Sequence, residues 1–571
     1  MKPFQVGLLG AGTVGGGTFA VLQRNQEEIR RRAGREIRIS HVADVDLVRA
    51  RSVVGGAAEV TSDARAVLQR PEIDAVIELI GGTTIAKTLV LEAIDAGKHV
   101  VTANKALLAV HGTEIFAAAR ENGVVVAFEA AVAGGIPIIK ALREGLTANR
   151  IEWIAGIING TTNFILSEMR EKRIDFAAAL ADARSVIANP AIDIVVELIG
   201  GVGIARTLVL EAIAAGKHVV TANKALLALH GTEIFAAAAA RGVVVAFEAA
   251  VAGGIPIIKA LREGLTANRI EWIVGIVNGT TNFILSEMRA KGLDFATALA
   301  QAQQLGYAEA DPTFDIAGID AGHKATIMSA IAFGIPVRFD RAHVEGIVDL
   351  QAADIAYAEQ LGYRIKLLAI TKRRNDLASS STDPSATGGI ELRVHPTLVP
   401  STRLIANVEG AMNAVMVQAD AVGTTLYYGK GAGSEPTASA VIADLVDITR
   451  LHTADPGHRV PYLAFQPGAM QDTPILPIDA VVTSFYLRLQ VADQAGVLAQ
   501  ITGILAGLDI SIDALLQRPS QHAAAAGAPH TDVIILTHDT VEGRMTTAIA
   551  QMQALPTVLA PIIRIRKEEL S

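Results

Sequence analysis

The sequence contains no cysteine, which excludes disulfides, thiolate zinc sites and a cysteine nucleophile. Positive charge is also scarce: 50 Lys+Arg against 58 Asp+Glu give a net charge of -8, whereas a protein that binds nucleic-acid phosphates carries a basic surface. The N-terminus lacks the pattern of a signal peptide. Apolar stretches such as residues 243–258 are interrupted, here by Glu248, before the ~18–20 residues of a membrane span. We expect a cytoplasmic protein without nucleic-acid or membrane partners.

What the sequence does contain is apolar material for several cores. Hydrophobic residues make up 51% and charged residues 19% of the 571 residues, a composition that excludes disorder over most of the length. At about 150 residues per domain, the length indicates roughly four domains.

One long segment occurs twice. Residues 62–180 return without a gap as residues 181–299, and 97 of the 119 positions are identical. Solenoid repeats are much shorter and more diverged, so this is not a solenoid. A recent tandem duplication and an error of sequence assembly both account for it. If the fold needs one copy, the surplus half-domain exposes apolar surface, and we expect an oligomer.

The N-terminal part alternates short apolar strands with helical patterns, which is typical of βαβ units in a doubly wound parallel sheet. The predicted strands are 6–10, 37–43, 75–80, 99–102 and 124–128, and the predicted helices run from the first strand to about Arg32, over 84–96 and over 112–121.

After residue 300 the pattern changes to that of an α+β domain, with strands predicted at 363–371, 391–398 and 414–420. Residues 373–389 read as a loop, and the proline-rich residues 465–480 as a linker. The rest follows the order βαββαβ of a small ferredoxin-like module, with strands at 484–491, 510–516, 533–538 and 562–565 and helices at 497–506 and 541–554.

A glycine-rich turn stands between the first strand and the first helix. Gly10 permits the tight turn, Gly12 lets a pyrophosphate approach the backbone and Gly15 allows close packing of helix on strand. Asp44, which closes the second strand, is the expected partner of the ribose and favours NAD, whereas Arg49 and Arg51 suit the 2′-phosphate of NADP. A purely structural turn and surface arginines are the alternatives.

Two motifs of the repeat follow strands at the sheet edge where open α/β sheets bind ligands. Thr-Ala-Asn-Lys ends at Lys105 and again at Lys224, and such a lysine can bind a carbonyl or carboxylate oxygen. The loops after Phe128 and Phe247 each hold one glutamate among small residues, whose free carbonyls suit a hard monovalent cation. A helix-start lysine on the surface and a tight interdomain turn are the alternatives.

The single-copy stretch 306–324 is the richest in chemistry. Asp320 and Lys324 are four residues apart and share one face of a helix, as an ordinary surface ion pair also would. Glu309, Asp311 and Asp315 lie just upstream and suit the ammonium group of an amino acid, while a lysine handles a proton at the reacting oxygen.

These motifs together resemble one family closely. The order GxGxxG, TANK, FEAxVAGGIP, NGTTNFIL, GYAEADPTxD and GxDAxxK is similar to that of homoserine dehydrogenase with a C-terminal ACT domain, over essentially the whole chain once one repeat is set aside. The resemblance implies a Rossmann-type doubly wound nucleotide domain, an α+β catalytic domain and a ferredoxin-like ACT domain. It also implies the NAD(P)-dependent interconversion of L-homoserine and L-aspartate 4-semialdehyde, in the biosynthesis of threonine, methionine and isoleucine.

The resemblance further implies roles for individual residues. Lys324 is the proton donor in aldehyde reduction, Asp320 orients the substrate, Glu309 binds its amino group, and Lys105 or Lys224 meets cofactor and substrate. The remaining implied residues are, for substrate, Gly306, Asp315, Asn278 and Thr280; for cofactor, Gly10, Gly12, Thr13, Val14, Gly15, Asp44, Arg49 and Gly433; and for sodium, Glu129, Val132, Gly134 and Ile136 or Glu248, Val251, Gly253 and Ile255. The loop from Asp493 to Gly496 resembles an ACT effector site and suggests threonine, and the family suggests a homodimer or tetramer.

The sequence departs from the family pattern only in the repeat. Copy one is continuous with the first two strands, and copy two with the catalytic segment. We therefore divide the chain into a nucleotide domain (1–130), the first-copy start of the catalytic domain (131–180), the second copy (181–299), the catalytic and dimerisation domain (300–464), a linker (465–480) and the ACT domain (481–571). A competing register takes every site residue from copy two. A different alternative is a relic that binds cofactor or effector without turnover.

Overall fold

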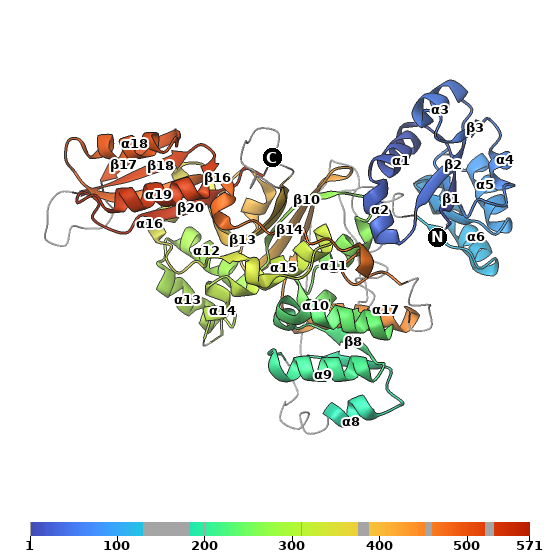
Figure 1. Cartoon of the computed structure of the whole chain (residues 1–571), viewed down its shortest axis with the longest axis horizontal. Helices are drawn as coiled ribbons and strands as arrows, with labels where there is room; N and C mark the ends of the chain where they lie inside the picture. The colour runs from blue at the N-terminus through green and yellow to red at the C-terminus, as the bar shows by residue number, and fades with distance from the viewer. Residues whose placement is uncertain are drawn as a thin grey trace.

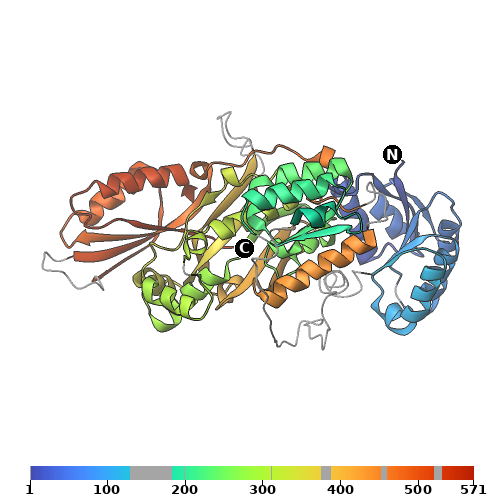
Figure 2. The same cartoon turned by 90° about the horizontal axis from the view of Figure 1, so that it is seen from below.

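The computed structural model describes residues 2–80, 82–128, 183–198, 200–309, 311–374, 388–451, 459–519 and 530–570. These residues form three sheets with covering helices. In both views the N-terminal sheet lies at one end of the molecule and the C-terminal module at the other (Figures 1 and 2). Within the described residues, no helix combines the length and apolar character needed to cross a membrane.

The N-terminal sheet is parallel and doubly wound, with strand order β3-β2-β1-β4-β5-β6. Its elements are β1 (Phe4–Leu9), α1 (Thr13–Arg24), α2 (Gln26–Ala33), β2 (Ile37–Ala43), α3 (Leu47–Val54), β3 (Glu59–Thr61), α4 (Ala64–Leu68), β4 (Ala75–Glu78), α5 (Thr84–Asp95), β5 (His99–Thr102), α6 (Lys105–Glu121) and β6 (Val126–Ala127). The fold class predicted from the sequence is confirmed.

Two predicted helices have different bounds. The first helical pattern is two helices, because Asn25 leaves the helical conformation and its side-chain amide donates to the carbonyl of Ala267 at 3.1 Å. The prediction over 112–121 missed the first two turns of α6. Asn104 caps that helix by accepting the amide of Leu107 at 3.1 Å, a start signal within the TANK motif.

The second copy folds as half of such a domain. Its parallel sheet β7-β8-β9 is built from β7 (Ile194–Glu197), β8 (His218–Thr221) and β9 (Val245–Ala246), with α8 (Ala183–Ala188), α9 (Gly203–Ala214) and α10 (Lys224–Arg241). The hydroxyl of Thr221 donates to Glu197 at 2.6 Å, as Thr102 does to Glu78 at 2.7 Å. The same residues therefore make the same local structure in both copies.

A helix from far along the chain covers this half-sheet. α17 (Ser434–Leu451) contacts β8 and the short 3-10 turn Glu248–Ala250, and Val441 and Ile448 pack with Val220 and Ala246. Val220 on β8 is fully buried, whereas its counterpart Val101 on β5 is 39% exposed. Only the copy-two sheet thus has this helix on its second face.

The catalytic and C-terminal parts share one mixed sheet, whose main strand order is β15-β14-β10-β12-β13-β20-β16-β18-β17. The catalytic elements are α11 (Ile257–Lys259), β10 (Ile270–Ile276), α12 (Gly279–Lys291), α13 (Phe295–Gln304), α14 (Thr313–Ile316), α15 (Ile319–Phe333), β11 (His343–Val344), α16 (Ala352–Gln360), β12 (Tyr363–Arg374), β13 (Gly389–Pro400), β14 (Met412–Ala419) and β15 (Gly423–Lys430).

The C-terminal module follows the predicted βαββαβ order, apart from the short β19 (Thr540–Val541). It comprises β16 (Val482–Ala492), α18 (Val497–Gly507), β17 (Ile512–Pro519), β18 (His530–Thr537), α19 (Glu542–Gln553) and β20 (Ile563–Lys567). β20 pairs in parallel with β13 of the catalytic part. The two domains are therefore joined through a continuous sheet.

The predicted linker 465–480 is a packed connection. Phe465 is buried beneath the guanidinium groups of Arg31 and Arg32, and Ile475 forms a parallel bridge with Ile390. Its prolines interrupt regular helices and strands, but the segment still packs against the core. Residues 375–387, most of the predicted loop 373–389, lie outside the described part, while β12 and β13 extend to its two ends.

Candidate active site

A buried cluster of charged side chains gathers at the start of α15. This helix is almost entirely buried, and Gly318, with φ of +81°, turns the chain into it. Lys324 Nζ lies 2.7 Å from Asp320 Oδ2 and also donates to the carbonyl of Val277 at 2.6 Å. The i,i+4 pair is therefore a buried pair, not a solvated surface contact.

Copy two supplies the second lysine of this cluster. Lys224 Nζ, at the start of α10, lies 3.1 Å from Asp320 Oδ1. The neighbouring Asn223 caps α10 by accepting the amide of Leu226 at 3.0 Å, which fixes the helix start. Each oxygen of Asp320 thus faces one lysine.

The NGTT motif joins the cluster through Asn278, the N-cap of α12. Its side-chain amide donates to Asp320 at 2.8 Å and to Asp315 at 2.7 Å. Thr280 donates its hydroxyl to the carbonyl of Tyr307 at 2.7 Å and lies 3.0 Å from the other oxygen of Asp315. Four predicted site residues, Asn278, Thr280, Asp315 and Asp320, are therefore in one hydrogen-bonded network.

The charges in this network shift one another's pKa values. Burial lowers the pKa of Lys324, Asp320 opposes that shift and Lys224 adds to it. Burial alone would raise the pKa of Asp320, but the two lysines hold it below its usual range. The pKa of Asp315 is raised by burial and by repulsion from Asp320. The result is an ionised Asp320 beside a lysine that gives up its proton more readily than a free one.

Aromatic side chains form an apolar edge that sequence reasoning missed. His323 is buried, with ring centroids 5.3 Å from Phe314 and 4.3 Å from Phe339, and Lys224 Nζ lies 6.0 Å from the centre of Phe314. Burial lowers the pKa of His323 to about 4, so the ring is neutral at pH 7. Phe314 and His323 could have been found from their position among the charged residues of 306–324, whereas Phe339 lies outside that stretch.

Two predicted substrate residues do not join the network in the described contacts. Glu309 is exposed, and only its backbone carbonyl takes a described bond, from the Gln303 side chain at 3.1 Å. Gly306 is exposed and adopts φ of +76° in the turn after α13. The ammonium-binding role of Glu309 stays a prediction.

The glycine-rich turn has the shape expected of a phosphate cradle. Gly10 has φ of +95°, and a Cβ there would lie 2.7 Å from the carbonyl oxygen of Leu79, so a side chain is excluded on both counts. At Gly12 a Cβ would meet nothing within 4 Å, which leaves open space beside the start of α1. Val14 is 56% exposed beside it; the side chains of Thr13 and Lys105 lie outside the described part.

Asp44 closes β2 beneath this turn. It accepts the amide of Ala11 at 2.6 Å and that of Asp46 at 2.8 Å, and Arg49 lies 3.3 Å away. Burial opposes the charge of Asp44, but these donors lower its pKa. The residues therefore fit a nucleotide whose phosphates meet the start of α1 and whose ribose meets Asp44.

The cradle and the lysine cluster belong to different parts of the structure. The turn from Gly10 packs against Leu79 in copy one, whereas the cluster uses Lys224 of copy two. In both views the β1–β6 sheet stands at the end of the molecule, away from α13 and α14 (Figures 1 and 2).

In the predicted cation loop of copy two, the carboxyl group of Glu248 is buried next to Asp444 of α17. Glu248 accepts the amides of Ile258 and Lys259, both at 2.9 Å, and its own amide donates to Asp444 at 2.8 Å. Burial and mutual repulsion raise the pKa of Glu248 to about 7, and burial raises that of Asp444 to about 6. Glu248 is thus a helix cap in the described structure.

The other members of that loop pair with the strand end before α17. The amide of Gly253 donates to the carbonyl of Gly431 at 3.0 Å, and Ile255 N–H donates to Ala252 O at 2.6 Å. Val251 is buried, and Gly433 is exposed with φ of +126°. The described residues contain no group of three or more acidic or histidine side chains arranged for a metal; Glu129, Val132, Gly134 and Ile136 lie outside them.

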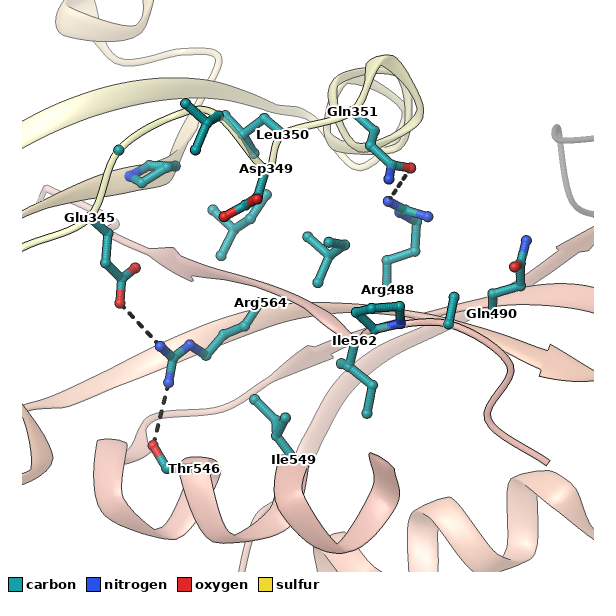
Figure 3. A pocket seen from close by; sticks show the side chains of 17 residues that line it. Glu345, Asp349, Leu350, Gln351, Arg488, Gln490, Thr546, Ile549, Ile562 and Arg564 are labelled. Atoms are coloured by element: carbon teal, nitrogen blue, oxygen red, sulfur yellow. Dashed lines mark hydrogen bonds and ion pairs between the residues drawn. The ribbon is translucent and has the colours of Figure 1, made fainter. Parts of the chain in front are cut away.

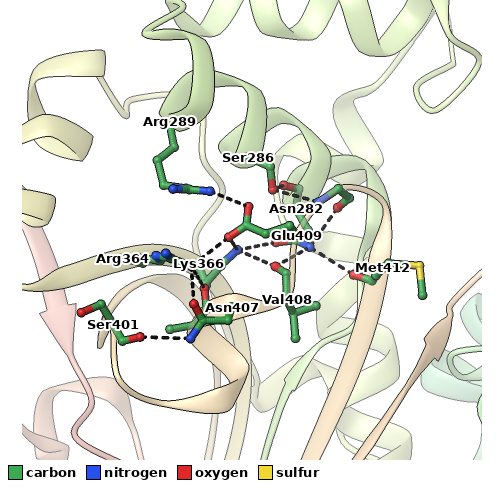
Figure 4. A network of polar contacts seen from close by, with 12 residues as sticks. Asn282, Ser286, Arg289, Arg364, Lys366, Ser401, Asn407, Val408, Glu409 and Met412 are labelled. Carbon is green, nitrogen blue, oxygen red and sulfur yellow. Dashed lines mark hydrogen bonds and ion pairs between the residues drawn. The ribbon is translucent and has the colours of Figure 1, made fainter. Parts of the chain in front are cut away.

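A polar network fixes the helix that carries Asn278 and Thr280 (Figure 4). The side-chain amide of Asn282 donates to the carbonyls of Val408 at 3.1 Å, Gly410 at 2.9 Å and Met412 at 3.1 Å. Lys366 Nζ donates to the carbonyl of Val408 at 2.6 Å, and burial lowers its pKa to about 8. The network ties α12 to the chain entering β14.

We expect Asn282→Ala to lower the free energy of unfolding by about 2–3 kcal/mol, because the carbonyls of Gly410 and Met412 lose the Asn282 amide, although that of Val408 keeps Lys366 as a donor. The measurement is the midpoint of urea unfolding. Asn122→Ala is the control, since Asn122 is exposed and its amide reaches one helical carbonyl at 3.1 Å. Equal shifts for both variants would contradict this role of Asn282.

A cavity of about 1160 Å³ lies where the catalytic and C-terminal parts meet (Figure 3). Glu345 and Gln351 line one wall, and Arg488, Thr546 and Arg564 the other. Arg564 lies 3.1 Å from Glu345, and Arg488 donates to Gln351 at 2.8 Å and pairs with Asp354 at 2.6 Å. The cavity therefore lies between the two domains, and polar contacts join its two walls.

Comparison with known proteins supplies the family. The NAD-binding domain of homoserine dehydrogenase matches residues 10–129, homoserine dehydrogenase matches 137–225 and 256–446, and the ACT domain matches 485–555. The homoserine dehydrogenases of Pseudomonas aeruginosa and Neisseria gonorrhoeae are each 46% identical, over 575 and 570 residues and 100% of both chains. The chain belongs to the homoserine dehydrogenase family. The crystal structure of the Thiobacillus denitrificans homoserine dehydrogenase is similar, with 49% identity, coverage of 100% and 99%, and a TM-score of 0.60.

Membership of the homoserine dehydrogenase family agrees with the geometry. The NAD-binding match spans both the Gly10–Gly15 turn and Asp44, which confirms NAD(P) as the cofactor class. The ACT match spans β16 to α19 and confirms the C-terminal domain.

Proposed function

We propose that this chain oxidises L-homoserine to L-aspartate 4-semialdehyde, and reduces it back, at the Lys324 cluster. The observation that carries the proposal is the buried arrangement of Lys324, Asp320 and Lys224 with the amide of Asn278. It puts one lysine of lowered pKa beside a carboxylate among buried side chains, which suits proton transfer at a carbonyl oxygen.

Each residue of the cluster has its own role in the reaction. NAD(P) supplies or receives the hydride at the reacting carbon. When the aldehyde is reduced, Lys324 gives a proton to its oxygen; when homoserine is oxidised, uncharged Lys324 takes the hydroxyl proton. Asp320 holds both lysines by charge, and Lys224 binds the substrate oxygen. Glu309 and Asp315 bind the substrate ammonium group, Asp315 being held by Asn278 and Thr280.

The test is the reduction of NAD⁺ and of NADP⁺ by L-homoserine with the purified full-length chain. Turnover with either supports the proposal, and the ratio decides between the two cofactors. Asp44 favours NAD⁺, since its carboxylate suits a ribose hydroxyl, whereas Arg49 suits a 2′-phosphate. Absence of homoserine-dependent turnover in a folded, cofactor-binding protein would favour the relic.

The rate of homoserine oxidation is expected to rise with pH to a plateau, with a midpoint below the ~10.4 of a free lysine. The reason is that oxidation needs Lys324 without its proton, and burial and Lys224 lower its pKa. Lys224→Met removes a positive neighbour and should move the midpoint up; Asp320→Asn removes a negative one and should move it down. Profiles of kcat/KM against pH measure both, and shifts in the same direction would contradict the assignment.

We also propose a sodium ion at the copy-two loop, held by Glu248 and the carbonyls of Val251, Gly253 and Ile255. The position of Glu248 supports it: its carboxylate is buried in a loop of small residues, and its amide donates to the buried carboxylate of Asp444 at 2.8 Å. Glu248 can keep its two backbone donors, since each carboxylate oxygen has two lone pairs.

The ACT domain is proposed to bind threonine as an effector. Supporting this, Gly496, with φ of +93°, turns the chain into α18. The pairing of β13 with β20 connects the ACT domain directly to the catalytic sheet. We further propose a cytoplasmic homodimer or tetramer.

Finally, we infer that residues 62–180 and 181–299 are a tandem duplication, on the identity of 97 of 119 positions and the repetition of local contacts. Arg65 pairs with Glu92 at 2.9 Å and Arg184 with Glu211 at 3.1 Å, each 27 residues apart. The proposed division gives the nucleotide sheet copy one and the catalytic domain copy two.

A further inference from the structure

Besides the α17 cover, the two copies of the repeated half-sheet differ in strand pairing. In copy one, β4 lies between β5 and β1, and Leu8 and Leu9 of β1 are paired with Ile77 and Glu78. In copy two, β7 pairs with β8 and is the edge of its sheet. Among the described residues no strand pairs with the outer edge of β7, and an edge strand favours the addition of a further strand.

Residues at matched positions of β4 and β7 differ in their exposure to solvent. Ala75 and Val76 are 4% and 1% exposed on β4, while their counterparts Ile194 and Val195 are only partly buried. Leu79 packs against the β1 core, whereas the identical Leu198 is 56% exposed. Within the described residues, the positions of β7 that match those covered by β1 in copy one are therefore the more exposed ones.

Copy two offers β1 nearly the same partner. The strands read Ala-Val-Ile-Glu and Ile-Val-Val-Glu, and each is followed by Leu-Ile-Gly-Gly. The turn at Gly10 rests against Leu79, so the same docking on β7 would bring it to Leu198. In that position the turn would lie beside the end of β8. There Asn223 donates to the carbonyl of Gly201 at 2.7 Å, and Lys224 is the next residue.

The β1–β3 unit, residues Phe4–Thr61, is already tied to the chain beside copy two. The amide of Gln466 donates to the carbonyl of Arg31 at 3.0 Å, and the side chains of Arg31 and Arg32 cover Phe465. Four residues earlier Tyr462 stacks on Phe235 of α10, with centroids 5.6 Å apart. Residues 459–466 thus bridge the unit and copy two, which makes a second copy of the chain unnecessary as donor.

We propose that the β7 edge is a second acceptor for the β1–β3 unit of the same chain, and that the nucleotide cradle meets Lys224 and Lys324 only when the unit is docked there. The exchange replaces one set of strand contacts by a nearly identical set, as in domain swapping. It also gives the completed sheet the α17 cover that β4 and β5 lack. The statement about the cradle rests on the proposed function; the statement about the edge does not.

The absence of cysteine allows a direct test by disulfide trapping. Gln5 of β1 is bonded through its carbonyl to the amide of Asp74 at 2.9 Å, and Asp193 is the exposed counterpart of Asp74 in copy two. Gln5→Cys is combined with Asp74→Cys, with Asp193→Cys or, as a control for random collision, with Glu233→Cys on α10. Peptide mass spectrometry of the full-length chain, oxidised and unreduced, identifies each link.

We expect both the 5–74 and the 5–193 link within one chain, well above the 5–233 link. Locking 5–74 should lower homoserine-dependent reduction of NAD(P)⁺ at least ~10-fold until the disulfide is reduced, while locking 5–193 should not. A missing 5–193 link, or one formed only between chains, would overturn the proposal, as would full activity of the 5–74 link. If both links form as expected but the protein shows no homoserine-dependent activity, the proposed function is wrong and the proposal that β7 is a second acceptor is still supported.

Discussion

Lys324→Ala is expected to lower kcat in both directions by about 10²–10⁴-fold, the usual contribution of a positioned general acid–base group. Lys324 Nζ is the buried donor that lies 2.7 Å from Asp320 and 2.6 Å from the carbonyl of Val277. Without it, the aldehyde oxygen loses its assigned proton donor. Steady-state rates of NAD(P)H formation and consumption measure the loss.

Two further measurements separate chemistry from folding. Lys324→Arg keeps the charge beside Asp320, but a guanidinium does not give up its proton near neutral pH, so the fold should persist and turnover should not. Thermal unfolding and NAD(P)H binding should stay close to the original values in this variant. An active Lys324→Arg enzyme would remove Lys324 from the proton-transfer role.

Lys224→Met is expected to lower kcat/KM by about 10²-fold, as loss of an interaction with the reacting oxygen in a buried site does. Lys224 is 3.1 Å from Asp320 Oδ1, so the substitution also removes one of the two charges that keep Asp320 ionised. The measurement is kcat/KM for homoserine with the cofactor held at saturation.

Lys105→Met is the matched comparison, because the two lysines stand in identical TANK motifs. Its effect should be the smaller one, since the described contacts of Asp320 include Lys224 and no residue of copy one. An equal or larger loss at Lys105 would mean that copy one forms the site. Free energies of unfolding of both variants show whether a loss reflects the site or the fold.

The sequence alone determined the chemistry and the kind of fold. Strand–helix alternation predicted the doubly wound sheet, and the spacing of Asp320 and Lys324 predicted a pair on one helix face. Gly10 and Gly15 predicted a tight turn, and neither has room for a side chain: Gly10 has φ of +95°, and a Cβ at Gly15 would collide with the carbonyl oxygen of Gly10. These features depend on residues close together in the chain, where local geometry follows directly from residue type.

Features that depend on distant packing were less accessible. Asn25 ends α1 through a bond to Ala267, far along the chain, so a continuous helical pattern misjudged the boundary. The edge formed by His323, Phe314 and Phe339 was missed for a similar reason, since only the folded chain brings Phe339 against His323.

Only the tertiary structure decided between the two copies. The motifs ending at Lys105 and Lys224 are identical and have the same local preferences, so nothing in either segment distinguishes them. The choice is made by elements that occur once: α15 with Asp320 and α17 lie against copy two, and β1 lies against copy one. Identical segments become different because each unique partner can pack against only one of them at a time.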